Sequence, residues 1–296
     1  MNLLITGAWT DAKSHIKEIE LAGHIVEFMQ QEKNPLPCSY DWVEGVICNG
    51  LFLHHPISRF TNLRYIQLTS AGYDRVPMEE IDRRHIEIHN ARGVYSIPMA
   101  EFVIAGVLDI FKAIDRFREQ QRKHEWIKIR EIRELADSRV VVVGCGSVGT
   151  ECAKRFKAFG CKVIGIDISP RDDCHYDIIN DLSLLQSEAI MADVMVLTLP
   201  LTDETRGLIN KEILDSFNGI LVNIARGGVV DQKALETWKG EAVLDVFEEE
   251  PLDNGSPLWE KKNTIVTPHN SFVGNGNRAR LYKCILGNIK KGQIQN

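Results

Sequence analysis

Apolar residues recur along the chain in short β-branched runs, separated by longer amphipathic segments. Continuous apolar runs of this length are typical of strands buried on both faces, and their regular alternation with helices predicts parallel sheets. The runs form a first set of five and a second set of six. The expected strands are 3–7, 24–29, 45–50, 65–70 and 86–90, then 139–144, 161–167, 193–200, 219–226, 242–247 and 264–269.

Two helical segments link these sets. Residues 97–123 carry an apolar stripe, with Pro98 near the start, and are expected to bridge two domains. Residues 277–290 follow the last strand and are expected to pack back onto the first set. The pattern predicts an α/β protein with two doubly wound parallel-sheet domains, the second inserted in the first. The expected domains are residues 1–92 plus 271–296, and residues 93–270.

Composition restricts the function classes. The 296 residues exceed what one core usually serves, and a formal charge of −6 argues against nucleic-acid binding. No apolar stretch approaches the ~20 residues that span a bilayer, and no signal peptide is evident. The seven cysteines lack metal-ligand spacing, so we expect reduced thiols in a cytoplasmic protein, with no metal site.

A glycine-rich turn follows the first strand of the second set. Gly144 permits a tight turn, Gly146 lets backbone approach a pyrophosphate, and Gly149 allows close packing of helix on sheet. The following helix offers free N–H groups and a partial positive charge to phosphates. The spacing predicts a dinucleotide site whose loop residues are Gly144, Gly146, Ser147, Val148 and Gly149.

An acidic residue stands about 20 positions further on, where this fingerprint requires one. Asp167 ends the next strand, and its carboxylate suits the ribose hydroxyls of NAD while repelling the 2′-phosphate of NADP. Arg171 is close enough in sequence to leave NADP as the less favoured alternative. NAD is the expected cofactor.

Four polar residues lie in, at the end of or just beyond the last three strands. Arg226 ends the fourth strand of the second set, Asp245 lies in the fifth with Glu250 beyond it, and His269 ends the sixth. Ligands of open α/β sheets bind outside the carboxyl ends of the strands. These side chains are therefore expected on the ligand-binding rim.

The residue types suit reduction of a 2-oxo acid. Arg226 offers a bidentate cation for the substrate carboxylate and the polarised carbonyl. His269 is the expected proton donor, and Glu250 would bond the second ring nitrogen and fix its tautomer. Taken alone, each residue could also have a role outside catalysis. Arg226 could be an ordinary loop arginine, Glu250 belongs to an acidic run of the kind that is usually solvated, and Asp245 suits a purely structural role.

At this point the sequence resembles the D-isomer-specific 2-hydroxyacid dehydrogenases. The resemblance covers residues 63–269, and it implies a Rossmann cofactor domain inserted in a flavodoxin-like substrate domain. The matching segments, in order, are NLRYIQLTSAGYDRV, IPMAEFVIA, VVVVGCGSVG, GID, TLPLTDETRGLI, NIARGGVVD, LDVFEEEPL, SPLW and TPH.

The resemblance also implies residue roles. Arg226, Glu250 and His269 match the catalytic residues, and the backbone of Ala71 and Gly72 matches a turn that grips the substrate carboxylate. A homodimer formed through about residues 97–135 is implied as well. The residues implied to line the cofactor site are Pro200, Thr205, Ala225, Arg226 and Asp245.

Three departures accompany the resemblance. The segment before Asp245 is short, which predicts a clipped helix, and the usual glycine before the first cofactor strand is missing from LADSRVVVVG. The loop NSFVGNGNR after His269 also differs, which leaves the substrate open among glyoxylate, hydroxypyruvate, 3-phosphoglycerate and similar acids.

Two alternatives remain. A dimeric NAD(H)-sensing interaction protein, like the corepressor branch of the family, would keep the fold without turnover. A formate dehydrogenase is disfavoured because its chemistry needs no protonating acid paired as His269 and Glu250 are expected to be.

Overall fold

The computed structural model describes residues 1–292, which divide into two compact units. Of the described residues, 1–95 and 274–292 group in unit 1, and 96–273 group in unit 2. The chain therefore passes from one unit to the other between residues 95 and 96 and between residues 273 and 274. The expected boundaries were 92/93 and 270/271. Val94 is buried in the apolar cluster of unit 1, and the hydroxyl of Tyr95 donates to the carbonyl of Thr69, so both residues stay with the first sheet.

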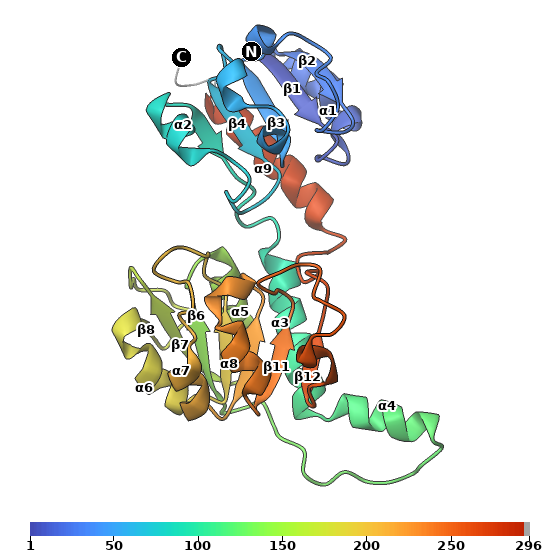
Figure 1. The fold of residues 1–296 in the computed structure, drawn as a ribbon, viewed down its shortest axis with the longest axis vertical. Coiled ribbons are helices and arrows are strands. Elements are labelled where there is room, and N and C mark those ends of the chain that lie inside the picture. Colours follow the sequence, from blue (N-terminus) through green and yellow to red (C-terminus); the bar gives the residue numbers. More distant parts are fainter. Residues whose placement is uncertain (293–296) are drawn as a thin grey trace. The chain divides into compact units, whose positions relative to one another are not determined.

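Unit 1 contains a five-stranded parallel sheet in the order β2-β1-β3-β4-β5 (Figure 1). The C-terminal helix packs on β1, because Leu281, Ile285 and Ile289 share an apolar cluster with Leu3 and Ile5. The elements of unit 1 are β1 Asn2–Thr6, α1 Ala12–Leu21, β2 Ile25–Met29, β3 Gly45–Cys48, β4 Tyr65–Leu68, α2 Met78–Arg83, β5 Glu87–His89 and α9 Asn277–Gly292.

Unit 2 contains a seven-stranded parallel sheet in the order β12-β11-β10-β9-β6-β7-β8 (Figure 1). Strand order reverses between β6 and β9, which makes that position the switch point where open α/β sheets bind ligands. Its strands are β6 Arg139–Val143, β7 Lys162–Asp167, β8 Ile178–Asp181, β9 Val194–Leu197, β10 Ile220–Asn223, β11 Glu241–Leu244 and β12 Thr264–Val266.

Helices cover both faces of this sheet. On one face, Val103 and Val107 of α3 and Phe156 of α5 pack on Val140 and Val243. On the other, α6, α7 and α8 bury residues against the opposite side chains of the same strands. The helices are α3 Ser96–Phe111, α4 Ile114–Arg122, α5 Ser147–Ala158, α6 Leu185–Ile190, α7 Lys211–Ser216 and α8 Gln232–Thr237.

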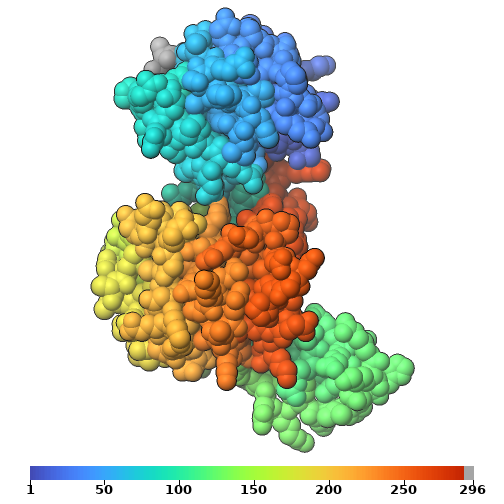
Figure 2. Space-filling view, viewed as in Figure 1, coloured from blue at the N-terminus to red at the C-terminus, as the bar shows by residue number. Residues whose placement is uncertain are grey.

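The two-sheet α/β class expected from the sequence is confirmed, but two elements differ. The expected helix 97–123 is broken at Ala113, whose φ of 50° is left-handed, and α4 buries no side chain. Figure 2 shows this green segment standing out from the rest of unit 2. Strand β8 was not expected because its exposed, partly polar sequence IIND lacks a buried apolar run.

Two departures noted in the sequence have structural counterparts. Helix α8, before β11, has only six residues, as the shortened segment predicts. Asp137, in the stretch where a glycine is usual, has a left-handed φ of 64°. In the described part of the chain, no helix is both long and apolar enough to cross a membrane.

Candidate active site

The glycine-rich loop joins β6 to α5, next to the switch point of the sheet. Gly144 has a φ of 96°, and a Cβ there would lie 2.8 Å from the backbone nitrogen of Leu199. A Cβ on Gly149 would lie 2.1 Å from the carbonyl oxygen of Gly144. A Cβ on Gly146 would meet nothing within 4 Å, so this residue faces open space at the N-terminus of α5. The loop therefore fits a dinucleotide phosphate beside Gly146.

Asp167, at the end of β7, is tied to this loop. Its Oδ2 accepts the N–H of Cys145 at 2.7 Å, and its Oδ1 accepts the N–H of Ser169 at 3.0 Å. Arg171 also reaches the loop, since its Nη2 donates to the carbonyl of Cys145 at 3.1 Å. The Asp167 carboxylate thus binds the N–H of Cys145, and the Arg171 guanidinium binds the carbonyl of the same residue. Both side chains lie where the ribose of the cofactor is expected.

The loop after β9 is held by a buried hydroxyl. Thr205 Oγ1 donates to the carbonyl of Pro200 at 2.7 Å and accepts the N–H of Thr202 at 2.7 Å. Thr205 and Ala225 are both about 5% exposed. Because both side chains are buried, they pack beneath the loops at the carboxyl ends of the strands and do not point into solvent.

The expected catalytic residues follow three neighbouring strands, β10, β11 and β12. His269 Nδ1 lies 2.8 Å from Glu250 Oε2, and the other Glu250 oxygen accepts the N–H of Phe247 at 3.1 Å. The ring of Phe272 packs edge-on against the imidazole, with centroids 5.9 Å apart. The His269 and Glu250 side chains are 41% and 38% exposed. The imidazole is therefore oriented through one nitrogen while it remains accessible.

Asp245 lies directly beyond β11 and is fully buried. Its carboxylate accepts the hydroxyl of Thr267 at 2.6 Å and the N–H groups of Asn270 at 2.7 Å and Ser271 at 2.9 Å. The N–H of His269 donates to the backbone carbonyl of Asp245 at 2.8 Å. These bonds enclose His269, whose φ of 50° is left-handed, so Asp245 shapes the loop that presents the imidazole.

Arg226 follows β10 in extended conformation. Its Nη1 donates to the carbonyl of Ala225 at 2.8 Å. Next to it, Gly227 lies so close to Phe247 that a Cβ would be 1.8 Å from the Phe247 carbonyl carbon. The backbone after Arg226 therefore packs directly on the backbone at Phe247, in the loop that leads to Glu250.

Sequence reasoning missed Asn223, a buried amide that ends β10. Its Oδ1 accepts the N–H of Ala225 at 3.1 Å, and its Nδ2 donates to the carbonyl of Arg226 at 3.1 Å. A lone amide at the end of an apolar strand was the available signal, because such a group is normally hydrogen-bonded.

Ala71 and Gly72 belong to unit 1, whereas the residues above belong to unit 2. Both carbonyls of this turn are engaged: Asn90 Nδ2 donates to Ala71 at 2.6 Å and Ser70 Oγ to Gly72 at 3.0 Å. The turn is thus fixed from its carbonyl side.

Comparison with known proteins identifies the family. Residues 104–271 match the sequence profile of the D-isomer specific 2-hydroxyacid dehydrogenase NAD-binding domain. A glyoxylate reductase of Korarchaeum cryptofilum is 32% identical over 78% of this chain and 74% of its own length. One from Thermofilum pendens is 34% identical over 77% of this chain and 71% of its own.

Solved structures agree. A D-isomer specific 2-hydroxyacid dehydrogenase from Xanthobacter autotrophicus, in complex with NADPH, has a TM-score of 0.77 and 29% identity, covering 97% of this chain and 95% of that one. A D-lactate dehydrogenase of Aquifex aeolicus, complexed with NAD and lactic acid, has a TM-score of 0.80 and 25% identity over 99% and 97%. This chain belongs to the D-isomer-specific 2-hydroxyacid dehydrogenase family and is an oxidoreductase that interconverts 2-hydroxy and 2-oxo acids with a nicotinamide cofactor.

Proposed function

We propose that this enzyme reduces a small 2-oxo acid, such as glyoxylate or hydroxypyruvate, to the D-2-hydroxy acid with NADH. The observation that carries the proposal is the 2.8 Å contact between His269 Nδ1 and Glu250 Oε2, on the strand-end rim of the sheet that also carries the glycine-rich loop. Names of relatives point the same way, since several are glyoxylate reductases.

A nicotinamide cofactor held by the glycine-rich loop would, when bound in its reduced form, supply the hydride for C2 of the acid, and the carbonyl oxygen would gain negative charge. His269 gives that oxygen a proton from Nε2, while Glu250 holds Nδ1 and stabilises the imidazole when it is charged. Arg226 polarises the carbonyl and pairs with the carboxylate. The reverse reaction uses neutral His269 as the base.

Binding roles follow the same scheme. Unit 2 would hold the cofactor through its glycine-rich loop, with Ser147 and Val148 at the start of α5. Unit 1 would supply the N–H groups of Ala71 and Gly72 to the substrate carboxylate. The part of the site next to the nicotinamide would be lined by Pro200, Thr205, Ala225 and Asp245.

NAD rather than NADP is the proposed cofactor, because the Asp167 carboxylate would repel a 2′-phosphate. We expect kcat/KM with NADH to exceed that with NADPH, and Asp167→Ala to narrow the difference. Arg171→Ala tests the alternative, in which the Arg171 guanidinium binds a 2′-phosphate and gives the enzyme a preference for NADPH. A wild-type enzyme that prefers NADPH, and loses this preference with Arg171→Ala, would reverse the assignment.

A substrate panel with both cofactors, repeated with His269→Gln, tests the proposed reaction. Wild-type turnover with at least one small 2-oxo acid is expected. The variant should lose roughly 10²–10⁴-fold in kcat while still binding NADH. No wild-type turnover with any acid, or a variant as fast as wild type, would refute the proposal.

We further propose a cytoplasmic homodimer, assembled through about residues 97–135, which include α4 and the segment after it. Support comes from exposed apolar side chains on this segment, with Ile114 36%, Phe117 37%, Ile127 59% and Trp126 97% exposed. All seven cysteines are free, as in reducing compartments. Sedimentation of the wild type against Trp126→Asp tests the dimer, and a monomeric wild type would contradict it.

A further inference from the structure

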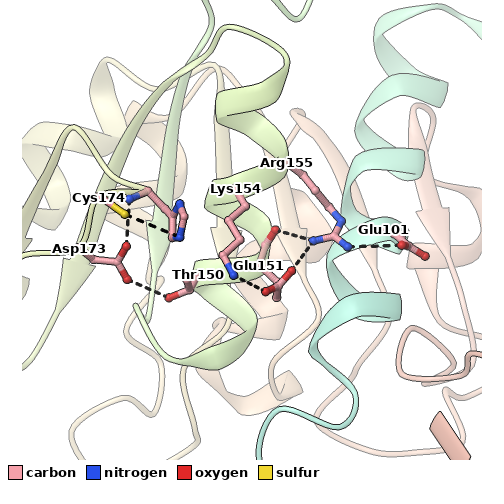
Figure 3. Close-up of polar contacts among 8 residues, drawn as sticks. Glu101, Thr150, Glu151, Lys154, Arg155, Asp173 and Cys174 are labelled. Carbon is pink, nitrogen blue, oxygen red and sulfur yellow. Dashed lines mark hydrogen bonds and ion pairs between the residues drawn. The ribbon is translucent and has the colours of Figure 1, made fainter. Parts of the chain in front are cut away.

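Outside the residues assigned above, three consecutive side chains in the loop between β7 and β8 bring together ligands of different chemistry. A carboxylate oxygen of Asp173, the Sγ of Cys174 and a ring nitrogen of His175 all lie within 4.8 Å of one another. Figure 3 shows Asp173 and Cys174 of this group beside α5, with Asp173 facing Thr150. The proposed hydride transfer uses none of the three.

The spacing is close to that of a metal centre. Cys174 Sγ lies 3.9 Å from His175 Nε2. In a tetrahedral zinc site, with Zn–S near ~2.3 Å and Zn–N near ~2.0 Å, sulfur and nitrogen ligands lie about 3.5 Å apart. Small side-chain rotations would therefore bring the thiolate and the imidazole onto one ion.

The site is accessible and has room for an ion with its water. Cys174 is the one exposed thiol among the seven cysteines, all of which lie in the described residues. Asp173 and Cys174, but not His175, line an open depression of about 530 Å³, which Arg171 and residues of β8 also line. The exposed thiol and the depression together set this group apart from an ordinary surface turn.

Hydrogen bonds already hold part of the arrangement. Asp173 Oδ1 accepts the N–H of His175 at 2.9 Å, and its Oδ2 lies 3.4 Å from the hydroxyl of Thr150 on α5. An ion bound here would fasten the loop to that helix.

We propose that Asp173, Cys174 and His175 bind one thiophilic divalent cation of the Zn²⁺ type, with water as the fourth ligand, and that this ion braces the β7–β8 loop. Thiolate and imidazole select zinc over magnesium or calcium, which prefer oxygen ligands. This proposal departs from the expectation of no metal site, which rested on the absence of the usual cysteine spacings.

The test uses the full-length, chelator-treated protein. Zn²⁺ is titrated calorimetrically, and Co²⁺ is added to report thiolate coordination through its absorption bands. We expect one equivalent to bind the wild type and raise its Tm. Cys174→Ser and His175→Ala should weaken binding by more than about 10-fold, since even outer partners of a metal ligand typically contribute 10–100-fold.

Cys38→Ser is the matched control, because Cys38 is a partly exposed thiol outside the group. It should bind Zn²⁺ as the wild type does. The proposal is overturned if the wild type binds no equivalent, or if Cys174→Ser and wild type bind with the same affinity and show the same rise in Tm.

Discussion

The carboxylate of Asp245 accepts the backbone N–H of Asn270 at 2.7 Å, which places a buried acceptor against the loop of His269. Together with the bonds from Thr267 and Ser271, this contact fixes the residues on both sides of the imidazole. The resemblance implies a place for Asp245 near the cofactor, with a purely structural role as the alternative from the sequence. The hydrogen bonds of its carboxylate show that it organises the loop.

Asp245→Asn should therefore lower both stability and activity. An amide nitrogen would face a backbone N–H, and a buried donor left unsatisfied costs roughly 1–3 kcal/mol. We expect a lower urea midpoint and a reduced kcat, with NADH binding less affected. Asp215→Asn, which alters an exposed pair with Lys211, is the control and should stay within about 0.5 kcal/mol of wild type. Equal behaviour of the two variants would remove Asp245 from its positioning role.

Glu250→Gln tests the partner of the imidazole. Glutamine keeps an acceptor for Nδ1–H but loses the charge, and hydrogen bonds to charged groups contribute about 1.5–3 kcal/mol. We expect kcat to fall roughly 10- to 100-fold with little change in NADH affinity. Glu249→Gln, an exposed neighbour, should have wild-type kcat. A wild-type kcat in Glu250→Gln would show that the charge plays no part in turnover.

Two glycine variants separate binding from folding. Gly146→Ala adds a methyl group in open space, so stability should be unchanged while NADH affinity falls. Gly149→Ala places a methyl group 2.1 Å from the Gly144 carbonyl and should destabilise the protein. Thermal unfolding and NADH fluorescence titration measure both quantities. Full NADH affinity in Gly146→Ala would place the pyrophosphate elsewhere.

Asp137→Gly should stabilise the enzyme. Asp137 is exposed and has a φ of 64°, a conformation in which glycine avoids a steric cost of up to about 1 kcal/mol. Asp172→Gly, at an exposed position without a positive φ, should instead lose a few tenths of a kcal/mol. Urea midpoints compare the two, and a loss of stability in Asp137→Gly would contradict the strain argument.

His24 predicts a pH dependence of stability. It is buried, and desolvation, with the positive N-terminus adding to it, lowers its pKa from the usual value. Because the unfolded chain binds this proton more readily, stability is fullest above about pH 6.5 and falls as the pH drops below it. His24→Gln should flatten part of the decline between pH 7.5 and 5.5 in urea unfolding. His54→Gln, at an exposed position, should leave the decline unchanged, and a His24→Gln profile equal to wild type would argue against the linkage.

Much of the fold was predictable because buried parallel strands are continuous β-branched runs, as RVVVV of β6 illustrates. Strand β8 was not predictable, since an edge strand needs no such run, and the break at Ala113 depends on a backbone conformation that alanine does not signal. In the site, His269 and Glu250 were expected as partners, and they lie 2.8 Å apart. The three donors to Asp245 come from residues over 20 positions away, which is why local pattern did not reveal them.

Transfer of deuterium tests the central claim most directly. The enzyme is incubated with NADH labelled with deuterium at C4 of the nicotinamide and with the 2-oxo acid that it reduces fastest, and the product is examined by NMR. We predict deuterium at C2 of a D-2-hydroxy acid in wild type and a strongly reduced yield with His269→Gln. A product without deuterium at C2, or equal yield from the variant, would contradict the proposed mechanism.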